Sequence, residues 1–141
     1  MKSKLFLTVV ACFTLLHCGK NPESSLQHLN GYWEIKEVTL ADGSKKEYTF
    51  SNTIDYIEVN DSLVGFRKKL TPTLEGKFKT SGDAENIKAI IQNDSLILEY
   101  KTPYSSWKET VLKATEDKLL ILNSRKDLYL YSRYEPLERM D

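Results

Sequence analysis

Cysteine and histidine are the side chains best suited to covalent or metal chemistry, and this chain of 141 residues contains two of each. Cys12 and Cys18 stand six positions apart near the N-terminus, and His28 follows ten residues after the second cysteine. A cysteine pair at this spacing could form a disulfide, supply half of a metal site, or include the attachment point of a membrane anchor. The residues around the pair favour one of these three.

The segment before Cys18 has the layout of a secretory signal. Lys2 and Lys4 give a positively charged start, and residues 5–16 carry no charge. This apolar stretch has the length of a signal-peptide core, and it is shorter than the ~20 residues that a transmembrane helix needs. We therefore expect residues 1–17 to be a signal peptide. Because Cys12 would be removed with it, we expect no disulfide between Cys12 and Cys18.

The end of this segment, Leu15-Leu16-His17-Cys18, resembles the lipobox of bacterial lipoproteins, with an aliphatic residue at minus three and a cysteine at plus one. The resemblance implies that Cys18 receives a diacylglyceryl group and, after cleavage, an acylated amino group. Val9-Val10-Ala11-Cys12 is the alternative match, but it leaves an apolar FTLLH on the mature side. Several acyl chains on one residue anchor a protein stably. We expect a lipid-anchored protein at the outer membrane of a Gram-negative bacterium, on its periplasmic or surface face.

The rest of the chain bounds the domain and its partners. Without residues 1–17 it keeps 18 basic and 20 acidic side chains, a net charge of −2. This balance offers no basis for nucleic-acid binding, and the length predicts one domain, which we expect to be a monomer. Residues 18–26 contain Pro22 and two serines and are expected to be a flexible tether. Residues 27–141 are expected to form the domain.

No set of residues predicts catalysis. His28 is the one histidine after the signal and lies beside the tether, where a capping or solvated role is expected. A zinc site needs several cysteine and histidine ligands, and the sequence has no Gly-x-Ser-x-Gly, P-loop or His-Glu-x-x-His pattern. The strand glutamates alternate with lysines, as on a solvated outer face; they are Glu34, Glu37, Glu58, Glu99 and Glu109. We expect no enzyme activity, no cofactor and no metal.

Short apolar runs separated by turn residues fill the chain after residue 30. The runs cover residues 31–40, 47–59, 63–70, 74–80, 85–91, 95–101, 107–114, 118–124 and 127–134. Asp42-Gly43 and Asn93-Asp94 are typical hairpin turns, and residues 23–30 form one helical candidate with Ser24 or Ser25 as its N-cap. The spacing predicts an all-β fold. A meander hides its edges most simply in a small antiparallel up-and-down barrel of about 8–9 strands; a two-layer sandwich is the alternative.

The start of the first strand, Leu29-Asn30-Gly31-Tyr32-Trp33, resembles the Gly-x-Trp signature of lipocalins. The resemblance implies that Gly31 lets the chain turn into the first strand and that Trp33 closes one end of the barrel. It also implies that a basic residue near the end of the last strand, here Arg133, packs over Trp33 by a cation–π contact. The chain is most similar to the small lipocalin-like domains of bacterial envelope lipoproteins.

A barrel of about eight strands either fills its interior with side chains or holds one small ligand. We expect a small apolar ligand, lined by inward residues of the predicted strands. These are Ile35, Phe66, Phe78, Leu98, Tyr100, Val111, Leu120 and Tyr131. The alternative is an anchored interaction or structural module with a filled barrel and no ligand, presenting Tyr104 and Trp107 to a partner.

The tetrapeptide Asn-Asp-Ser-Leu occurs twice, at 60–63 and 93–96. Good turn chemistry explains both copies, because Asn and Asp tolerate positive φ. Each copy also resembles the Asp-Ser/Thr-aliphatic sites of O-glycosylation in some Gram-negative envelope proteins. The resemblance implies that Ser62 and Ser95 are possible glycosylation sites.

Overall fold

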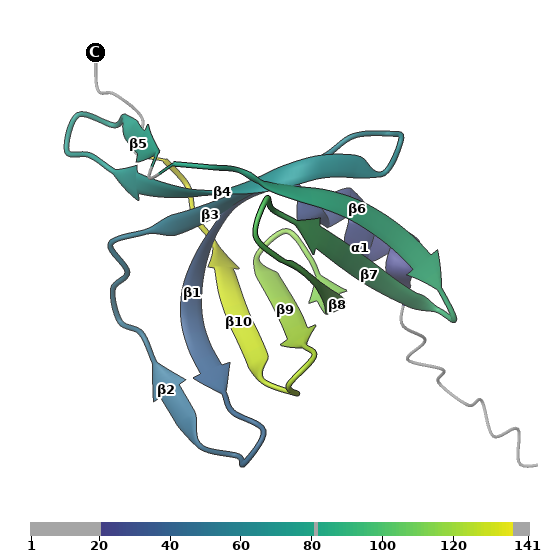
Figure 1. Cartoon of the computed structure of the whole chain (residues 1–141). Helices are drawn as coiled ribbons and strands as arrows, with labels where there is room; N and C mark the ends of the chain where they lie inside the picture. The colour runs from purple at the N-terminus through teal and green to yellow at the C-terminus, as the bar shows by residue number, and fades with distance from the viewer. Residues whose placement is uncertain (1–20, 81, 137–141) are drawn as a thin grey trace, which may run out of the picture.

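The structure, a computed structural model, describes residues 21–80 and 82–136, and Figure 1 shows their arrangement. One helix, α1 (Pro22–Leu29), precedes ten strands within these ranges. The strands are β1 (Gly31–Thr39), β2 (Lys45–Glu47), β3 (Ile54–Val59), β4 (Val64–Pro72), β5 (Phe78–Thr80), β6 (Glu85–Gln92), β7 (Ser95–Lys101), β8 (Ser106–Ala114), β9 (Lys118–Asn123) and β10 (Leu128–Arg133).

Eight of these strands form a closed antiparallel barrel. Successive barrel strands pair in chain order from β3 to β10 with β5 left out, and β1 joins the two ends by pairing with both β3 and β10. The short strands β2 and β5 extend β1 and β4 outside the ring and project at its margins in Figure 1. Because the ring is closed, every barrel strand pairs with a neighbouring strand on both sides. The predicted all-β up-and-down barrel is confirmed.

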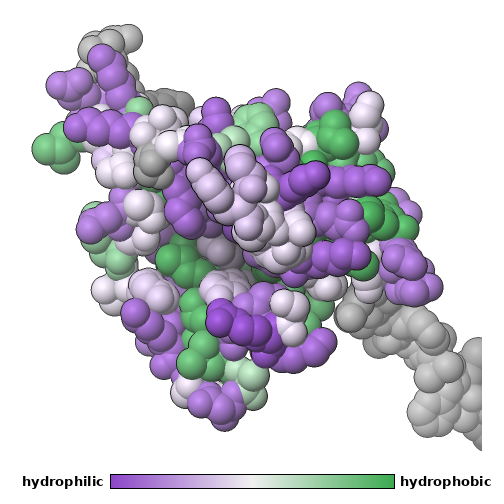
Figure 2. Space-filling model, in the orientation of Figure 1, coloured by the Kyte–Doolittle hydropathy of each residue, from purple (hydrophilic) through white to green (hydrophobic). Residues whose placement is uncertain are grey.

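The core lies inside the barrel because alternate residues of each strand point inward. On β7, Leu96, Leu98 and Tyr100 are almost fully buried, while the residues between them are only partly covered. Helix α1 covers one end of the barrel, packs on β7 and β8, and buries Leu29 completely. Polar side chains dominate the visible outer face in Figure 2.

The turns follow the local sequence. Asn93 and Asp94 adopt φ values of 51° and 58° between β6 and β7, as a two-residue hairpin of type I′ requires. Gly43, with φ of 88°, allows the reversal after β1, where the Leu40 amide donates to the Ser44 carbonyl at 2.8 Å. Both predicted hairpins are confirmed.

Two boundaries differ from the expectation. The predicted run 47–59 is two elements, because β2 ends at Glu47 and β3 begins at Ile54. Helix α1 begins at Pro22, so the tether prediction is wrong for residues 22–26. The N-cap is Asn21, not Ser24 or Ser25, and its side-chain oxygen accepts from the Ser24 amide at 3.1 Å. The predicted signal peptide and Cys18 lie outside the described residues.

Candidate functional site

The closed end of the barrel is built around Trp33, which has no exposed surface. Its indole N–H donates to the Leu29 carbonyl of α1 at 2.8 Å, so the helix end and the indole satisfy each other. The Arg133 guanidinium lies 3.8 Å from the centroid of the Trp33 ring. β10 places it there because Arg133 stands opposite Trp33 in the β1–β10 register.

Arg133 also ties two backbone segments together through four carbonyl groups. Its guanidinium donates to the carbonyls of His28 at 2.8 Å, Asn30 at 2.6 Å, Glu116 at 2.8 Å and Thr115 at 3.2 Å. These carbonyls come from the end of α1 and from the turn between β8 and β9. The fixed planar fork of an arginine suits such multiple contacts. The closed end is therefore a packing device with every polar group of its two key side chains engaged.

Gly31 is required at this end for two reasons. Its φ of +129° is a conformation that L residues rarely adopt. A Cβ at this position would also overlap the Arg133 guanidinium. The structure therefore brings Gly31, Trp33 and Arg133 into one contact group.

The eight predicted ligand-lining residues divide into two groups. Leu98, Tyr100, Val111 and Tyr131 are buried in the core, and Ile35 packs against it. Phe66, Phe78 and Leu120 lie on the outer face. Phe66 stands opposite the exposed Glu58, and Leu120 alternates with fully buried neighbours on β9. The prediction that these three line the interior is wrong.

The misplaced phenylalanines belong to a group that we call the outer aromatic cluster, which consists of Tyr32, Tyr56, Phe66, Phe78 and Tyr134. Neighbouring ring centroids lie 4.8 to 6.3 Å apart along the outside of β1, β3, β4 and β5. Tyr32 stacks on Phe78, which fastens the short strand β5 to the barrel wall. Phe78 is partly covered by Tyr32 and Tyr134, which explains its partial burial without any role in the interior.

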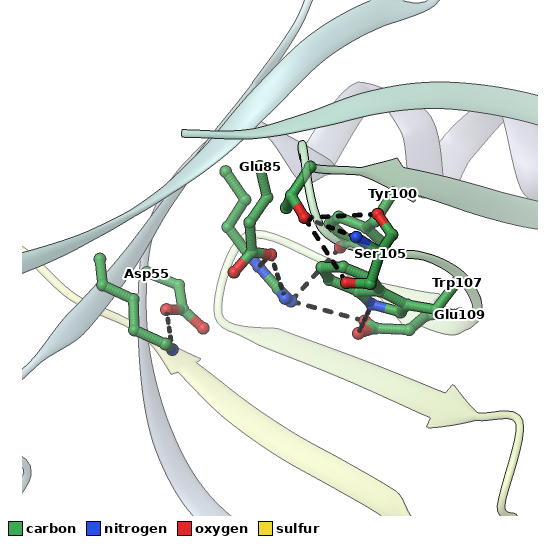
Figure 3. Close-up of polar contacts among 9 residues, drawn as sticks. Asp55, Glu85, Tyr100, Ser105, Trp107 and Glu109 are labelled. Carbon is green, nitrogen blue, oxygen red and sulfur yellow. Dashed lines mark hydrogen bonds and ion pairs between the residues drawn. The ribbon is translucent and has the colours of Figure 1, made fainter. Parts of the chain in front are cut away.

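The middle of the interior contains a charged network that the sequence did not indicate. Arg67, with 11% of its side chain exposed, donates to Glu85 Oε2 at 2.6 and 2.9 Å. The remaining guanidinium nitrogen, Nη1, lies 3.5 Å from Glu109 Oε2. The guanidinium also lies 4.4 Å from the Tyr100 ring centroid and donates to the Tyr100 hydroxyl at 3.4 Å. Figure 3 shows Glu85, Tyr100 and Glu109 gathered around this point.

Trp107 completes the network. Its ring stacks on Tyr100 with centroids 5.1 Å apart, and its indole N–H donates to Glu109 Oε1 at 3.2 Å. Burial raises the pKa of the Tyr100 phenol, although the Arg67 charge acts in the opposite direction. Trp107 is therefore an interior side chain, and of the two residues expected to face a partner only Tyr104 is exposed.

The interior also contains a cavity of about 270 Å³ between β1, β10 and the chain leading into β3. Trp33 lies at its inner limit. The lining is aromatic and aliphatic with one ion pair, and consists of Trp33, Ile35, Val38, Tyr48, Ser51, Thr53, Asp55, Lys69, Tyr129 and Tyr131. Asp55 Oδ1 accepts from Lys69 Nζ at 2.7 Å. Two of the predicted liners, Ile35 and Tyr131, line this cavity.

A second hollow, of about 520 Å³, lies over β6, β7 and β8. Its lining includes the exposed Lys88, Lys101 and Lys108, which alternate with inward residues, so it is a groove on the outer face. Lys108 is paired with Glu99 at 2.9 Å. This groove is separate from the interior cavity.

The remaining predicted sites lie in turns. Ser62 is exposed between β3 and β4, and Ser95 begins β7 half-buried. In the described ranges, no group of three or more His, Cys, Asp or Glu side chains is placed to hold a metal ion. The single helix described here is too short and too polar to cross a bilayer.

Sequence reasoning missed Arg67 and Asp55. The expectation that Glu109 lies on a solvated outer face is wrong, because its carboxylate points inward to Arg67 and Trp107. One signal was available: Glu85 alternates in phase with the apolar Ile87 and Ala89, which marks it as inward. A carboxylate on the inner face requires a cation nearby. The segment GFRKKL alone could not show that Arg67 faces inward, because the neighbouring Phe66 favours the assignment in which Phe66 is inside and Arg67 outside.

No curated protein matches the chain. A lipocalin-like protein from Bacteroides uniformis has a crystal structure that superposes with a TM-score of 0.49 and 9% sequence identity, covering 76% of this chain and 99% of that one. The family model for the lipocalin-like domain matches residues 29–121, more than half of the chain. The protein belongs to the lipocalin-like domain family.

Proposed function

We propose that this protein is a lipid-anchored envelope lipoprotein whose barrel binds one small ligand in the interior cavity. The observation that carries the ligand role is the cavity of about 270 Å³ above Trp33, lined by aliphatic and aromatic side chains with a few polar groups. This composition is typical of small-molecule sites. The volume lies slightly below the usual range of ~300–1,000 Å³, which favours a compact ligand over a long acyl chain.

Ligand binding is tested best with Trp33 as the reporter. The chain has two tryptophans, so Trp107→Phe leaves Trp33 alone while keeping an aromatic ring against Tyr100. This protein is titrated with 2-phenylethylamine, 2-phenylethanol and 3-phenylpropanoate. A saturable change of Trp33 emission with at least one probe is expected, because Trp33 lines the cavity.

A matched pair of variants locates the binding. Val38→Phe fills the cavity and should abolish the response, whereas Leu120→Phe adds comparable bulk on the outer face and should leave it unchanged. Native mass spectrometry of protein extracted from its own membranes provides an independent readout. If no probe binds and no small molecule copurifies, the ligand role is wrong.

The membrane anchor is supported by the sequence around Cys18 and is tested separately. Cys18→Ser should release the protein from membranes, and Cys12→Ser should leave it attached. The opposite result would move the anchor to Cys12. Mass spectrometry of the envelope-extracted protein also tests the proposed outer-membrane location and the proposed glycans at Ser62 and Ser95, because unmodified serines would exclude the glycans.

A second function, an anchored interaction module, is favoured by one observation. The outer aromatic cluster leaves five rings partly exposed on one wall, and Tyr104 is 91% exposed at the β7–β8 turn. Aromatic side chains are frequent interface anchors. Cross-linking in membranes should then give a partner that Phe66→Ser or Tyr104→Ser loses, while Val38→Phe retains it.

A further inference from the structure

We propose that the interior cavity selects a small organic cation, a compact apolar body with an ammonium group that is held by Asp55. The inference rests on the proposed ligand-binding role and adds the chemical class of the ligand. It depends on four features of the cavity: a buried carboxylate, an exposed counterion, aromatic walls and an excess of interior carboxylates.

The buried carboxylate is Asp55, whose side chain is only 7% exposed. β3 places it on the inner face, opposite Trp33 of β1 and Lys69 of β4. A carboxylate removed from water in this way requires a cation or several hydrogen-bond donors. Figure 3 shows Asp55 away from Glu85 and Glu109, on its own side of the interior.

The counterion is Lys69, whose ammonium lies 2.7 Å from Asp55 while 53% of its side chain is exposed. A lysine side chain is a point charge on a long flexible stem, so its ammonium can return to water without disturbing the core. A ligand ammonium can take its place on Asp55. Lys69 thus occupies, in this structure, the position that we assign to the cationic group of the ligand.

The walls favour a cation over an anion. Tyr48, Tyr129 and Tyr131 line the cavity together with Trp33. The faces of aromatic rings carry negative potential and attract ammonium groups within ~6 Å. The Tyr48 ring already has a cation at such a distance, since Lys46 Nζ lies 4.9 Å from its centroid. An anion would instead meet these ring faces and Asp55, with Lys69 as the single cation among the described lining residues.

The charges behind the cavity act in the same direction. Arg67 is contacted by two carboxylates, Glu85 and Glu109, and Lys69 is paired with Asp55. These five interior groups therefore carry one net negative charge. Burial raises the pKa of the Tyr131 phenol, and the Asp55 carboxylate raises it further. Burial and the Asp55 charge thus disfavour a negative charge at Tyr131, and the net negative charge of the five interior groups is what favours a positive one.

The experiment compares three probes of nearly equal shape by titration calorimetry at pH 7: 2-phenylethylamine as the cation, 2-phenylethanol as the neutral form and 3-phenylpropanoate as the anion. The amine should bind at least ~10-fold more tightly than the alcohol, and the carboxylate should bind most weakly. Rising salt should weaken the amine alone.

Two variants assign the preference to its groups. Asp55→Asn keeps the side-chain shape and should weaken amine binding ~10-fold while leaving the alcohol unchanged. Lys69→Met removes the competing ammonium and should strengthen amine binding. Glu58→Gln, a carboxylate on the outer face of the same strand, is the matched control and should change neither. Circular dichroism verifies that each variant is folded. The order of affinity among the three probes is measured in the unmodified protein, so that result does not depend on the folding of any variant.

The outcomes separate the two proposals. If the alcohol or the carboxylate binds as tightly as the amine and Val38→Phe abolishes that binding, the cavity is a ligand site but the inference of a cation is wrong. If Asp55→Asn folds and still prefers the amine, Asp55 is not the recognising group. If no probe binds and no small molecule copurifies with the protein, both proposals fail together.

Discussion

The two ends of the barrel interior are built on opposite principles. At the closed end, Trp33 and Arg133 stack, and every nitrogen of their two side chains donates to a backbone carbonyl. At the open side, Asp55 is buried but its partner Lys69 is largely exposed, and a cavity remains beside the pair. Polar groups that are hydrogen-bonded and closely packed fix a structure. A buried charge beside free volume, with a counterion that can leave, is suited instead to exchanging that counterion for a ligand. The same eight strands therefore contain a structural half and a receptive half.

The largest effect should come from the closed end. Trp33→Ala removes the largest fully buried side chain together with its bond to Leu29, and it should destabilise the protein by about 3–5 kcal/mol. Urea denaturation at neutral pH gives this value. Val38→Ala at the cavity is the comparison and should cost about 1–2 kcal/mol, because existing free volume reduces the packing that is lost. Equal costs would contradict the division into two halves.

Arg67 lies between the halves, and its removal should have the next largest effect. Arg67→Met leaves Glu85 and Glu109 without their cation and should destabilise by about 3 kcal/mol. The triple variant Arg67→Met with Glu85→Gln and Glu109→Gln should recover most of this loss, because no uncompensated charge remains. Thermal melts of the two proteins give the difference. A triple variant no more stable than the single one would mean that Arg67 acts through packing alone.

A smaller effect separates backbone strain from crowding at the closed end. Gly31 and Gly82 have nearly equal φ values of 129° and 133°, but only Gly31 has a side chain against its missing Cβ. Replacement by Ala should cost about 1–3 kcal/mol at either position through strain. Gly31→Ala should cost about 1–2 kcal/mol more, because Arg133 must move. Denaturation of the two single variants measures the difference directly.

The smallest effect is confined to alkaline pH. Burial raises the pKa values of Tyr100 and Tyr131 above the ordinary value of 10.0. A raised folded-state pKa means that the stabilisation is complete below the unfolded pKa near 10 and is lost as the pH rises through the folded values. Stability should therefore decline above about pH 10. The double variant Tyr100→Phe with Tyr131→Phe should show a flatter decline in denaturation experiments.

The sequence predicted the closed end better than the open side for a physical reason. At the closed end, Gly31 and Trp33 stand two residues apart and match the lipocalin signature, and that resemblance implies the basic residue at the end of the last strand, Arg133. The interior network depends on carboxylates that reach Arg67 from β6 and β8, and only the register of the folded barrel brings these together. Phe66 favoured the wrong face of β4 because its covering partners, Tyr56 and Lys68, lie outside the barrel.

Phe78 and Leu120 were misassigned for related reasons. The ring of Phe78 contacts Tyr32 and Tyr134. Both residues lie far from Phe78 in the sequence, so no local sequence pattern predicts these contacts. Leu120 lies between two buried residues in a strand that is apolar on both faces, so the sequence pattern does not show which residues face inward. The turns at Asp42-Gly43 and Asn93-Asp94 were predictable because the backbone conformation there depends on the turn residues themselves.

If the cavity side of the barrel is the receptive half, a bound probe must lie there, and its position can be measured. Nuclear Overhauser contacts between 2-phenylethylamine and methyl-labelled protein report which side chains lie within a few ångströms of the probe. We expect contacts to the methyl groups of Ile35 and Val38 in the cavity and none to Val64 on the outer face. Contacts to Val64 without any to Ile35 and Val38 would contradict it.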